Sequence, residues 1–227
     1  MTAARRRGEA LRADYDARGW VVADDVCAPP MVDALRAGFD AVVDDAVARA
    51  RYPSREVCLR LVQLWSDPWR AAPIYSELLQ DPAIAELACG ILGCEQVRVL
   101  TQRMVCKSPD GRAPLPWHQD LPSWRVATPR ALSIWVALDD VDAASGGLRY
   151  LSGSHQTEDP EAEPVDGDVR AGGVLIHHPL VWHTSTANRS GRWRRACLLA
   201  VADATVPPRQ GEWDPARNPV LPGAPVG

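Results

Sequence analysis

The chain has 227 residues and a formal net charge of −4 at pH 7, with 46% hydrophobic and 24% charged residues. These values are typical of a globular protein with one core, and we expect a single domain over residues 1–227. Because the net charge is mildly negative, we do not expect nucleic acid as a partner. The longest apolar stretch, around residues 84–94, is too short to cross a membrane.

Two further features predict a cytoplasmic location. The amino terminus, Met1 to Arg18, is charged throughout and lacks the apolar centre of a secretory signal. The six cysteines are scattered and include no CxxC pair, which is typical of reduced, small apolar side chains rather than a metal or disulfide framework.

The first 95 residues are predicted to be mostly helical. Residues 19–22 resemble a short strand. Residues 29–50 follow with apolar side chains at helical spacing after two prolines that suit a helix start. Residues 77–92 predict one or two more helices, with Pro82 opening the second.

From residue 97 the pattern changes to short β-rich segments separated by turn residues. Helices followed by many strands indicate the α+β class. We expect a mainly β fold, a double-stranded β-helix (jelly-roll barrel) over residues 96–204 with the amino-terminal helices on one face. The expected strands cover residues 97–106, 131–138, 148–151, 173–176, 181–186 and 192–201.

Two segments are predicted to be irregular. Residues 157–168 carry six acidic side chains among prolines, which favours a solvated loop, with a lid over a site as the alternative. Residues 205–227 hold six prolines and no periodicity, which predicts an extended arm or a partly disordered tail.

The sequence PWHQD at 116–120 places a histidine and a carboxylate two residues apart, on one face if the segment is a strand. Together with the distant His183, His118 and Asp120 would supply two imidazoles and one carboxylate. That donor set leaves open coordination positions and is typical of non-haem Fe(II) oxygenases. His155, His177 and His178 lack such partners, and we interpret them as structural.

A cationic site is expected beside His183. If residues 183–194 form a hairpin that turns near Arg189 and Ser190, Ser185 lies across from Arg194. A guanidinium and a hydroxyl in this arrangement suit a carboxylate, although Arg194 is equally consistent with a surface arginine. Fe(II), one aspartate, two neutral imidazoles, Arg194 and a 2-oxo diacid would sum to zero charge.

Several motifs in fixed order resemble the phytanoyl-CoA dioxygenase family of Fe(II)/2-oxoglutarate-dependent oxygenases, from about residue 14 to residue 203. They are KSPDG (107–111), PWHQDL (116–121), LSIWVALD (132–139), GGLRYLSGSH (146–155), HPLVWH (178–183) and STAN (185–188) followed by RRA (194–196).

This resemblance implies His118, Asp120 and His183 as iron ligands. It implies that Arg194, with Ser185, binds the distal carboxylate of 2-oxoglutarate. Trp135 and Lys107 match positions along this cosubstrate, and Gln102 is a weaker candidate for the same pocket. A core aromatic at Trp135 and a strand-edge amide at Gln102 are equally consistent with the sequence.

The reaction implied by the resemblance converts 2-oxoglutarate and O2 to succinate and CO2 while a substrate is hydroxylated. Desaturation, epimerisation or cyclisation would begin at the same site, whereas Asp120 argues against halogenation. With one lysine and no basic cluster, we expect a small metabolite or natural-product intermediate rather than an acyl-CoA. Three residues could line the mouth of a substrate site, with an aromatic core or rim as the alternative: Trp65, Trp124 and Arg125.

Two alternatives of other classes remain open at this level. A non-catalytic β-barrel could hold a metal or small ligand with the same residues. A zinc hydrolase is also compatible with two histidines and one carboxylate, but it leaves Arg194 without a diacid to bind.

Overall fold

The computed structural model describes residues 1–227 except 62–63, 110–113, 127, 158–161 and 223–227. The helices are α1 (Ala3–Arg18), α2 (Pro29–Ala48), α3 (Arg55–Leu61), α4 (Ile74–Gln80) and α5 (Pro82–Leu92), with short 3-10 turns η1 (Pro68–Arg70) and η2 (Leu121–Ser123). The strands are β1 (Trp20–Ala23), β2 (Leu64–Ser66), β3 (Gln96–Lys107), β4 (Leu115–His118), β5 (Ala131–Ala137), β6 (Leu148–Leu151), β7 (Pro164–Gly167), β8 (Val174–His177), β9 (His183–Ser185), β10 (Arg194–Asp203) and β11 (Val220–Pro222).

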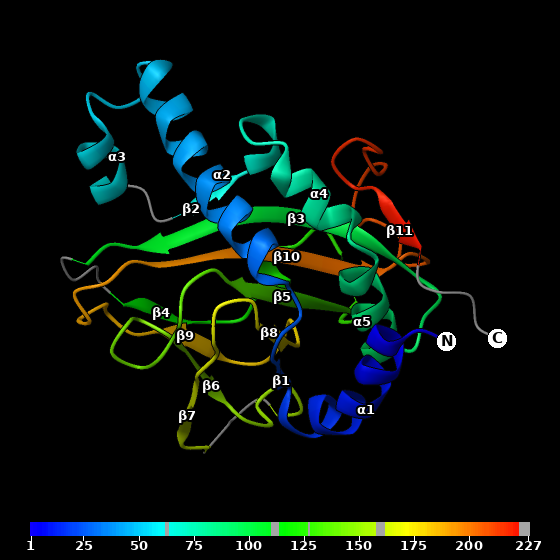
Figure 1. Ribbon diagram of the computed structural model, residues 1–227. Helices are drawn as coiled ribbons and strands as arrows, with labels where there is room; N and C mark the ends of the chain where they lie inside the picture. Colours follow the sequence, from blue (N-terminus) through cyan, green and yellow to red (C-terminus); the bar gives the residue numbers. More distant parts are fainter. Residues whose placement is uncertain (62–63, 110–113, 127, 158–161, 223–227) are drawn as a thin grey trace.

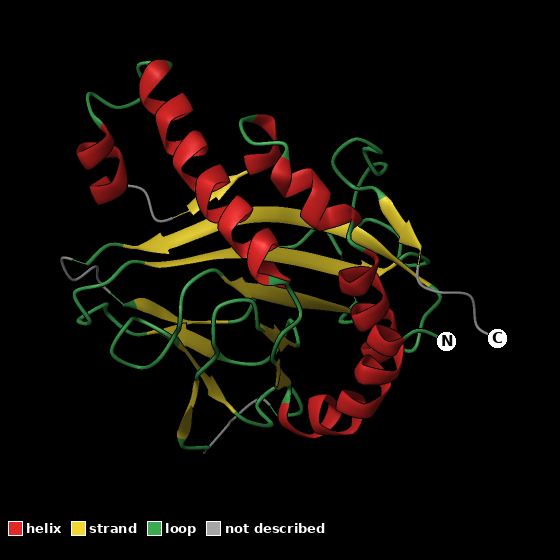
Figure 2. Ribbon diagram, viewed as in Figure 1, coloured by secondary structure: helices red, strands yellow, loops and turns green. Residues whose placement is uncertain are grey.

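These strands form two antiparallel sheets (Figure 1). The larger sheet has the order β1-β8-β5-β10-β3-β11, with β2 also paired to β3, and the smaller has the order β4-β9-β6-β7. The helices cover the outer face of the larger sheet, and the smaller sheet lies on its other side (Figure 2). The predicted double-stranded β-helix with amino-terminal helices on one face is therefore confirmed.

Two hydrophobic layers explain why the central strands are apolar on both faces. All seven residues of β5 are buried. Alternate side chains of β5 and β8, such as Ile134 and Ile176, join the cluster under the helices. The others, such as Trp135 and Leu175, pack between the two sheets against Tyr150 of β6. The inner layer ends at one side in a polar cavity, described below.

Helix α1 was not predicted because its sequence carries little hydrophobic periodicity. It packs on α5 through Gly8 and Gly90. A Cβ on Gly90 would lie 2.8 Å from the Cα of Gly8, so the two backbones approach more closely than any larger residue permits. Gly19 ends the helix in the left-handed conformation, φ 78°, and leads directly into β1.

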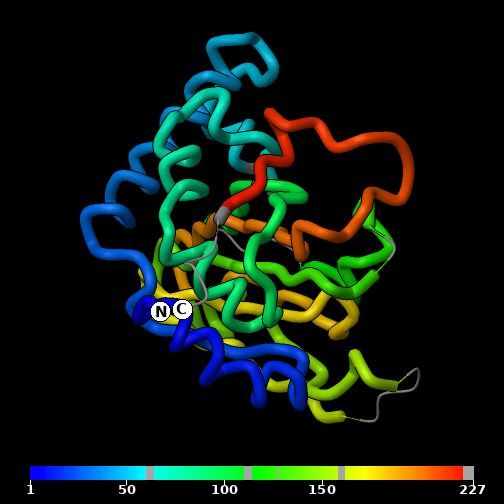
Figure 3. Tube along the Cα trace, turned by 90° about the vertical axis from the view of Figure 1, so that its right-hand side faces the viewer, coloured from blue at the N-terminus to red at the C-terminus, as the bar shows by residue number. Residues whose placement is uncertain are grey.

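Both segments predicted to be irregular contain a strand. Part of the acidic segment forms β7, which pairs with β6 and carries an ion pair of 2.6 Å between Arg149 and Asp166. The lid hypothesis for this segment falls partly on residues 158–161, which lie outside the described residues. In Figure 3 the carboxy-terminal segment, orange to red, loops outward and returns to the sheet, where β11 pairs with β3.

Candidate metal centre

Two histidines face each other across paired strands of the smaller sheet. His118 at the end of β4 is opposite His183 at the start of β9, and their ring centroids are 4.1 Å apart. Asp120 is not on the strand, so the predicted alternation of His118 and Asp120 on one strand face is wrong. The backbone of Asp120 is helical, φ −77° and ψ −39°, and its N–H donates to Pro179 O. The turn after β4, rather than the strand pleat, brings the carboxylate back to the imidazoles.

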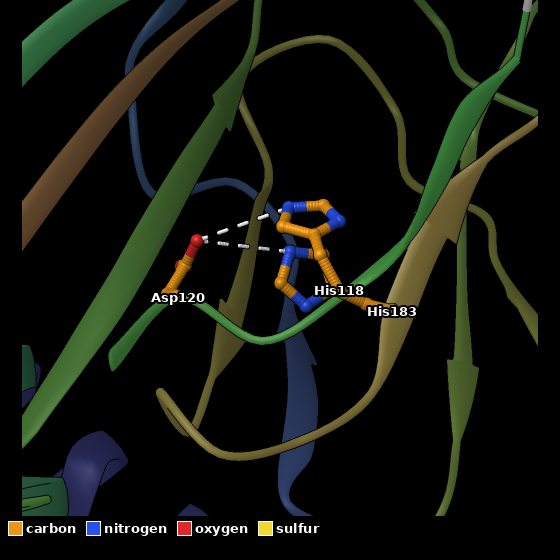
Figure 4. Close-up of side chains that lie close together, drawn as sticks. All are labelled: His118, Asp120 and His183. Atoms are coloured by element: carbon orange, nitrogen blue, oxygen red, sulfur yellow. Dashed lines mark ion pairs between the residues drawn. The ribbon is translucent and has the colours of Figure 1, made fainter. Parts of the chain in front are cut away.

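The three side chains offer one donor atom each to a common point (Figure 4). Oδ1 of Asp120 is 3.9 Å from Nε2 of His118 and 4.0 Å from Nε2 of His183. All three donor atoms lie within 4.8 Å of one another. Bonds of about 2.0–2.2 Å to a first-row cation hold ligand atoms roughly 3–4 Å apart, so a modest rotation of these side chains would bring the three donors onto one ion. The residues present therefore fit a non-haem iron, whose usual donors are two histidines and one carboxylate.

The hydrogen bonds of the imidazoles fix which nitrogen faces the metal position. Nδ1 of His118 is 2.9 Å from Pro116 O, and Nδ1 of His183 is 3.1 Å from Val181 O. Because a carbonyl oxygen only accepts, each Nδ1 carries the proton and each Nε2 presents its lone pair. Burial, reinforced by the neighbouring His177, lowers the pKa of His183 to about 3, which keeps this ring neutral.

The second oxygen of Asp120 is held away from the metal position. Ser133 Oγ donates to Oδ2 at 2.7 Å, and His177 Nε2–H donates to the same oxygen at 3.2 Å. The Tyr150 hydroxyl then donates to Nδ1 of His177 at 3.2 Å. Burial alone raises the pKa of Asp120, but the hydrogen bonds that His177 and Ser133 donate outweigh this effect and hold the pKa well below its usual value. Oδ1 is therefore the carboxylate oxygen that faces the imidazoles of His118 and His183.

Contrary to the expectation of a purely structural histidine, His177 lines this cavity, with 2% of its surface exposed. The sequence offered one usable signal. Ser133 is the one polar residue of β5, and it lies directly opposite His177 in the β5–β8 register. By contrast, His178 and His155 lie outside the cavity, with ring centroids 4.8 Å apart and His155 Nε2 3.0 Å from Asp16 O.

The triad lies in a cavity of about 160 Å³ between the two sheets. Arg194 and Ser185 both line it, but not as a hairpin: β9 belongs to the smaller sheet, whereas β10 pairs with β3 and β5 in the larger. The hairpin prediction is therefore wrong. Arg194 lies across from Lys107 of β3 instead. The described lining residues are Leu64, Arg103, Val105, Cys106, Lys107, Leu115, His118, Asp120, Trp135, Leu148, His177, His183, Ser185, Arg194 and Leu198.

Arg194 and Lys107 form a buried pair of cations in this cavity. Lys107 Nζ donates to the carbonyl oxygens of Ser185, at 3.3 Å, and Thr186. Burial, together with the Arg194 charge, lowers the pKa of Lys107 to about 7. Burial also lowers the pKa of Arg194 to about 10, and its guanidinium carbon is 5.3 Å from the Trp135 ring centroid. Among the described residues Arg194 forms no ion pair, and its Nε is buried without a hydrogen-bond partner. Lys107 and Arg194 could therefore bind an anionic ligand.

Four other predicted site residues are not brought to the cavity. The amide of Gln102 points to the helical side and donates to Tyr75 O at 2.6 Å. Trp65 packs edge-on against Phe39, with ring centroids 5.9 Å apart. Trp124 is buried in a separate small cluster, and Arg125 donates to Gln210 O at 3.0 Å in the carboxy-terminal segment. Leu64, Leu115 and Arg103, which the sequence did not single out, line the cavity instead.

A jelly roll with two histidines and one carboxylate between its sheets defines the class of non-haem iron oxygenases. The family model of phytanoyl-CoA dioxygenase (PhyH) matches residues 15–196. The chain therefore belongs to the phytanoyl-CoA dioxygenase family.

The chain is also similar to individual proteins in sequence and in fold. Ectoine dioxygenase of Bordetella parapertussis is 31% identical over 157 residues, covering 65% of this chain and 51% of that protein. The 2-oxoglutarate-dependent carbocyclase SnoK from nogalamycin biosynthesis superposes with a TM-score of 0.75 at 24% identity, covering 92% and 89% of the two chains. The epimerase SnoN, solved with Fe³⁺, 2-oxoglutarate and nogalamycin RO, gives 0.74 at 23% identity, covering 98% and 96%.

The chain spans about half the length of the curated relatives it matches. Among the helices of the described residues, none combines the length and the apolar character needed to cross a bilayer.

Proposed function

We propose that this protein is an Fe(II)- and 2-oxoglutarate-dependent dioxygenase that hydroxylates a small organic molecule. The observation that carries the proposal is the meeting of His118, Asp120, His183 and the unpaired Arg194 in one cavity. Neither the metal donors nor the cation alone would indicate this reaction. Together they provide for both the iron and a dicarboxylate cosubstrate.

The protein residues hold and orient the reactants. His118 and His183 would bind Fe(II) through Nε2, and Asp120 through Oδ1, while Ser133 and His177 keep Oδ2 occupied. Because Asp120 would bind through one oxygen, the three protein ligands would leave room at the iron for the cosubstrate and O2. When bound, the iron supplies O2 activation coupled to the decarboxylation of 2-oxoglutarate to succinate and CO2.

At the far end of the cosubstrate, Arg194 would donate two hydrogen bonds to the distal carboxylate, with Lys107 as a second cation and Ser185 as a hydroxyl partner. The guanidinium carbon of Arg194 lies 5.3 Å from the centroid of the Trp135 ring, which would stabilise the cation. The net reaction converts substrate, 2-oxoglutarate and O2 into hydroxylated substrate, succinate and CO2.

The substrate class is a small metabolite or natural-product intermediate. The cavity of about 160 Å³ is below the range of roughly 300–1,000 Å³ of sites for drug-sized ligands, which supports a small substrate. The carbocyclase and epimerase among the similar structures support a second outcome, in which hydrogen abstraction ends in ring closure or epimerisation instead of hydroxylation.

Succinate release tests the proposal. Purified protein supplied with Fe(II), ascorbate, O2 and 2-oxoglutarate should form succinate, and a metabolite that is a substrate should stimulate this turnover. Mass spectrometry of the stimulated reaction then separates hydroxylation (gain of one oxygen) from desaturation or ring closure (loss of two hydrogens) and epimerisation (no change in mass). Binding of Fe(II) and 2-oxoglutarate without any succinate would favour a non-catalytic barrel, and hydrolysis with Zn(II) would favour a hydrolase.

A further inference from the structure

Arg103 lines the same cavity but lies far from the Lys107–Arg194 pair. Side chains of β3 alternate, so Arg103, Val105 and Lys107 face the cavity while Gln102, which bonds the Tyr75 carbonyl, faces the helices. Arg103 and Lys107 are four residues apart on this strand, roughly 13 Å between their Cα atoms at about 3.3 Å per residue.

The charge of Arg103 is not used by the fold. Within the described residues it forms no ion pair, and its Nε is buried without a hydrogen-bond partner. Two other arginines of the sheets are paired: Arg195 with Asp139 at 2.7 Å and Arg149 with Asp166 at 2.6 Å. Among the described lining residues Asp120 is the one acid. Its Oδ1 faces His118 and His183, and its Oδ2 accepts hydrogen bonds from Ser133 and His177. A cation left unpaired in a cavity wall is a binding site for an anion.

The two cationic ends lie at different positions along the strands, which favours two separate anionic groups. Arg194 and Lys107 lie opposite each other on β10 and β3, whereas Arg103 pairs in register with Leu198 further along the same two strands. Val105 lies between the two ends on β3, and Leu198 lines the cavity opposite Arg103. If the cosubstrate occupies the Arg194 end, Arg103 remains for a second molecule.

The position of Arg103 relative to the cavity entrance agrees with a substrate role. Leu64 of β2 and Leu115 of β4 line the cavity from opposite sheets and are 42% and 45% exposed. Leu64 lies opposite Val105, two residues from Arg103 on β3. The entrance is thus apolar, with one guanidinium beside it.

We propose that the substrate of this site is a small organic anion, a carboxylate or phosphonate-type oxyanion, whose charged group binds Arg103 and whose carbon body lies along Leu64, Val105 and Leu198 toward the triad. This inference rests on the proposed function for the identity of the site. It narrows the substrate class from any small metabolite to those with one acidic group at a distance from the reacting carbon.

Binding to protein loaded with Zn(II) and saturating 2-oxoglutarate tests the inference without turnover. The probes are small carboxylic acids with their primary amides, and alkylphosphonates with their dimethyl esters, measured by saturation-transfer NMR and titration. We expect at least one acid to bind about tenfold or more tightly than its neutral partner. Arg103→Gln should remove this preference by weakening the acid and not the neutral compound, and Arg103→Lys should restore part of it.

Arg189→Gln is the matched control, because Arg189 is an exposed arginine in the turn before β10. It should keep the wild-type preference, and thermal unfolding should show that each variant is folded. The inference is overturned if no acid is preferred by the wild type, or if the preference survives in Arg103→Gln. A preference without succinate release in any reaction mixture would instead refute the proposed function and leave the anion site standing. The carboxylate and phosphonate series separate the two sources of the oxyanion.

Discussion

The metal end of the cavity and its entrance are built in opposite ways. At the metal end each imidazole has a carbonyl partner on Nδ1, and the outer oxygen of Asp120 has two donors. At the entrance, Leu64 and Leu115 are exposed and Arg103 has no charged partner among the described residues. The chemistry is thus fixed in place by the fold, whereas the entrance keeps unsatisfied groups for a ligand to complete. The predictions below test this contrast.

The largest effect is expected from Asp120→Ala. This change removes the one anionic donor and should abolish both stoichiometric metal binding and succinate release, as measured by metal analysis after dialysis and by product assay. Asp24→Ala, at an exposed position outside the cavity, is the control and should behave as wild type. Full metal content in Asp120→Ala would show that the cation lies elsewhere.

Arg194→Gln should come next, with an increase of about 10- to 100-fold in the KM for 2-oxoglutarate, the range for a lost charged hydrogen bond. The kcat at saturating cosubstrate should change much less, because the triad is intact. The neighbouring exposed Arg192, which pairs with Asp142 at 3.5 Å, provides the control Arg192→Gln. An unchanged KM in Arg194→Gln would show that Arg194 does not bind the cosubstrate and has only a structural role.

His177 supports Asp120 rather than the metal itself, so its removal should weaken the site without abolishing it. His177→Ala should reduce Fe(II) affinity by about 10- to 100-fold, the usual effect of losing a group that orients a ligand. His177→Gln, which can still donate to Oδ2, should recover part of the affinity. His178→Gln changes the adjacent histidine outside the cavity and should leave the metal affinity unaltered.

The pH dependence of cosubstrate binding reports on Lys107. Its pKa is lowered to about 7 in the ligand-free protein, so the ammonium form that attracts a carboxylate is present below this pH and is lost above it. The KM for 2-oxoglutarate should rise about tenfold between pH 6 and pH 8, following the fraction of protonated lysine. Lys107→Arg should flatten this profile, and a wild-type profile that is already flat would show that Lys107 does not contribute.

The sequence predicted the fold class, and the three residues it offered as metal donors lie together in the structure, because both depend on local pattern. Strand-forming segments with turns between them gave nearly all of the barrel, and two histidines with a near carboxylate are rare enough to be noticed. The strand argument for Asp120 was wrong in detail, since the backbone turns after His118. The triad still forms because Pro179 O accepts the N–H of Asp120.

What could not be predicted depends on contacts between sheets and between backbones. The sequence 183–194 looks like a hairpin, and nothing local shows that β9 and β10 belong to different sheets. His177 follows an apolar strand buried on both faces, so its direction is set only by the pairing with Ser133. The position of helix α1 depends on the close contact of Gly8 and Gly90, and no hydrophobic pattern in the sequence predicts this contact.

The most direct test is a crystal structure of the protein with Fe(II) under anaerobic conditions, with the metal located by anomalous scattering. One peak should lie about 2.0–2.2 Å from Nε2 of His118, Nε2 of His183 and Oδ1 of Asp120, with Oδ2 still bonded to Ser133 and His177. A peak that lacks any of these three ligands, or an Asp120 that binds through both oxygens, would contradict the assignment of His118, Asp120 and His183 as the metal ligands.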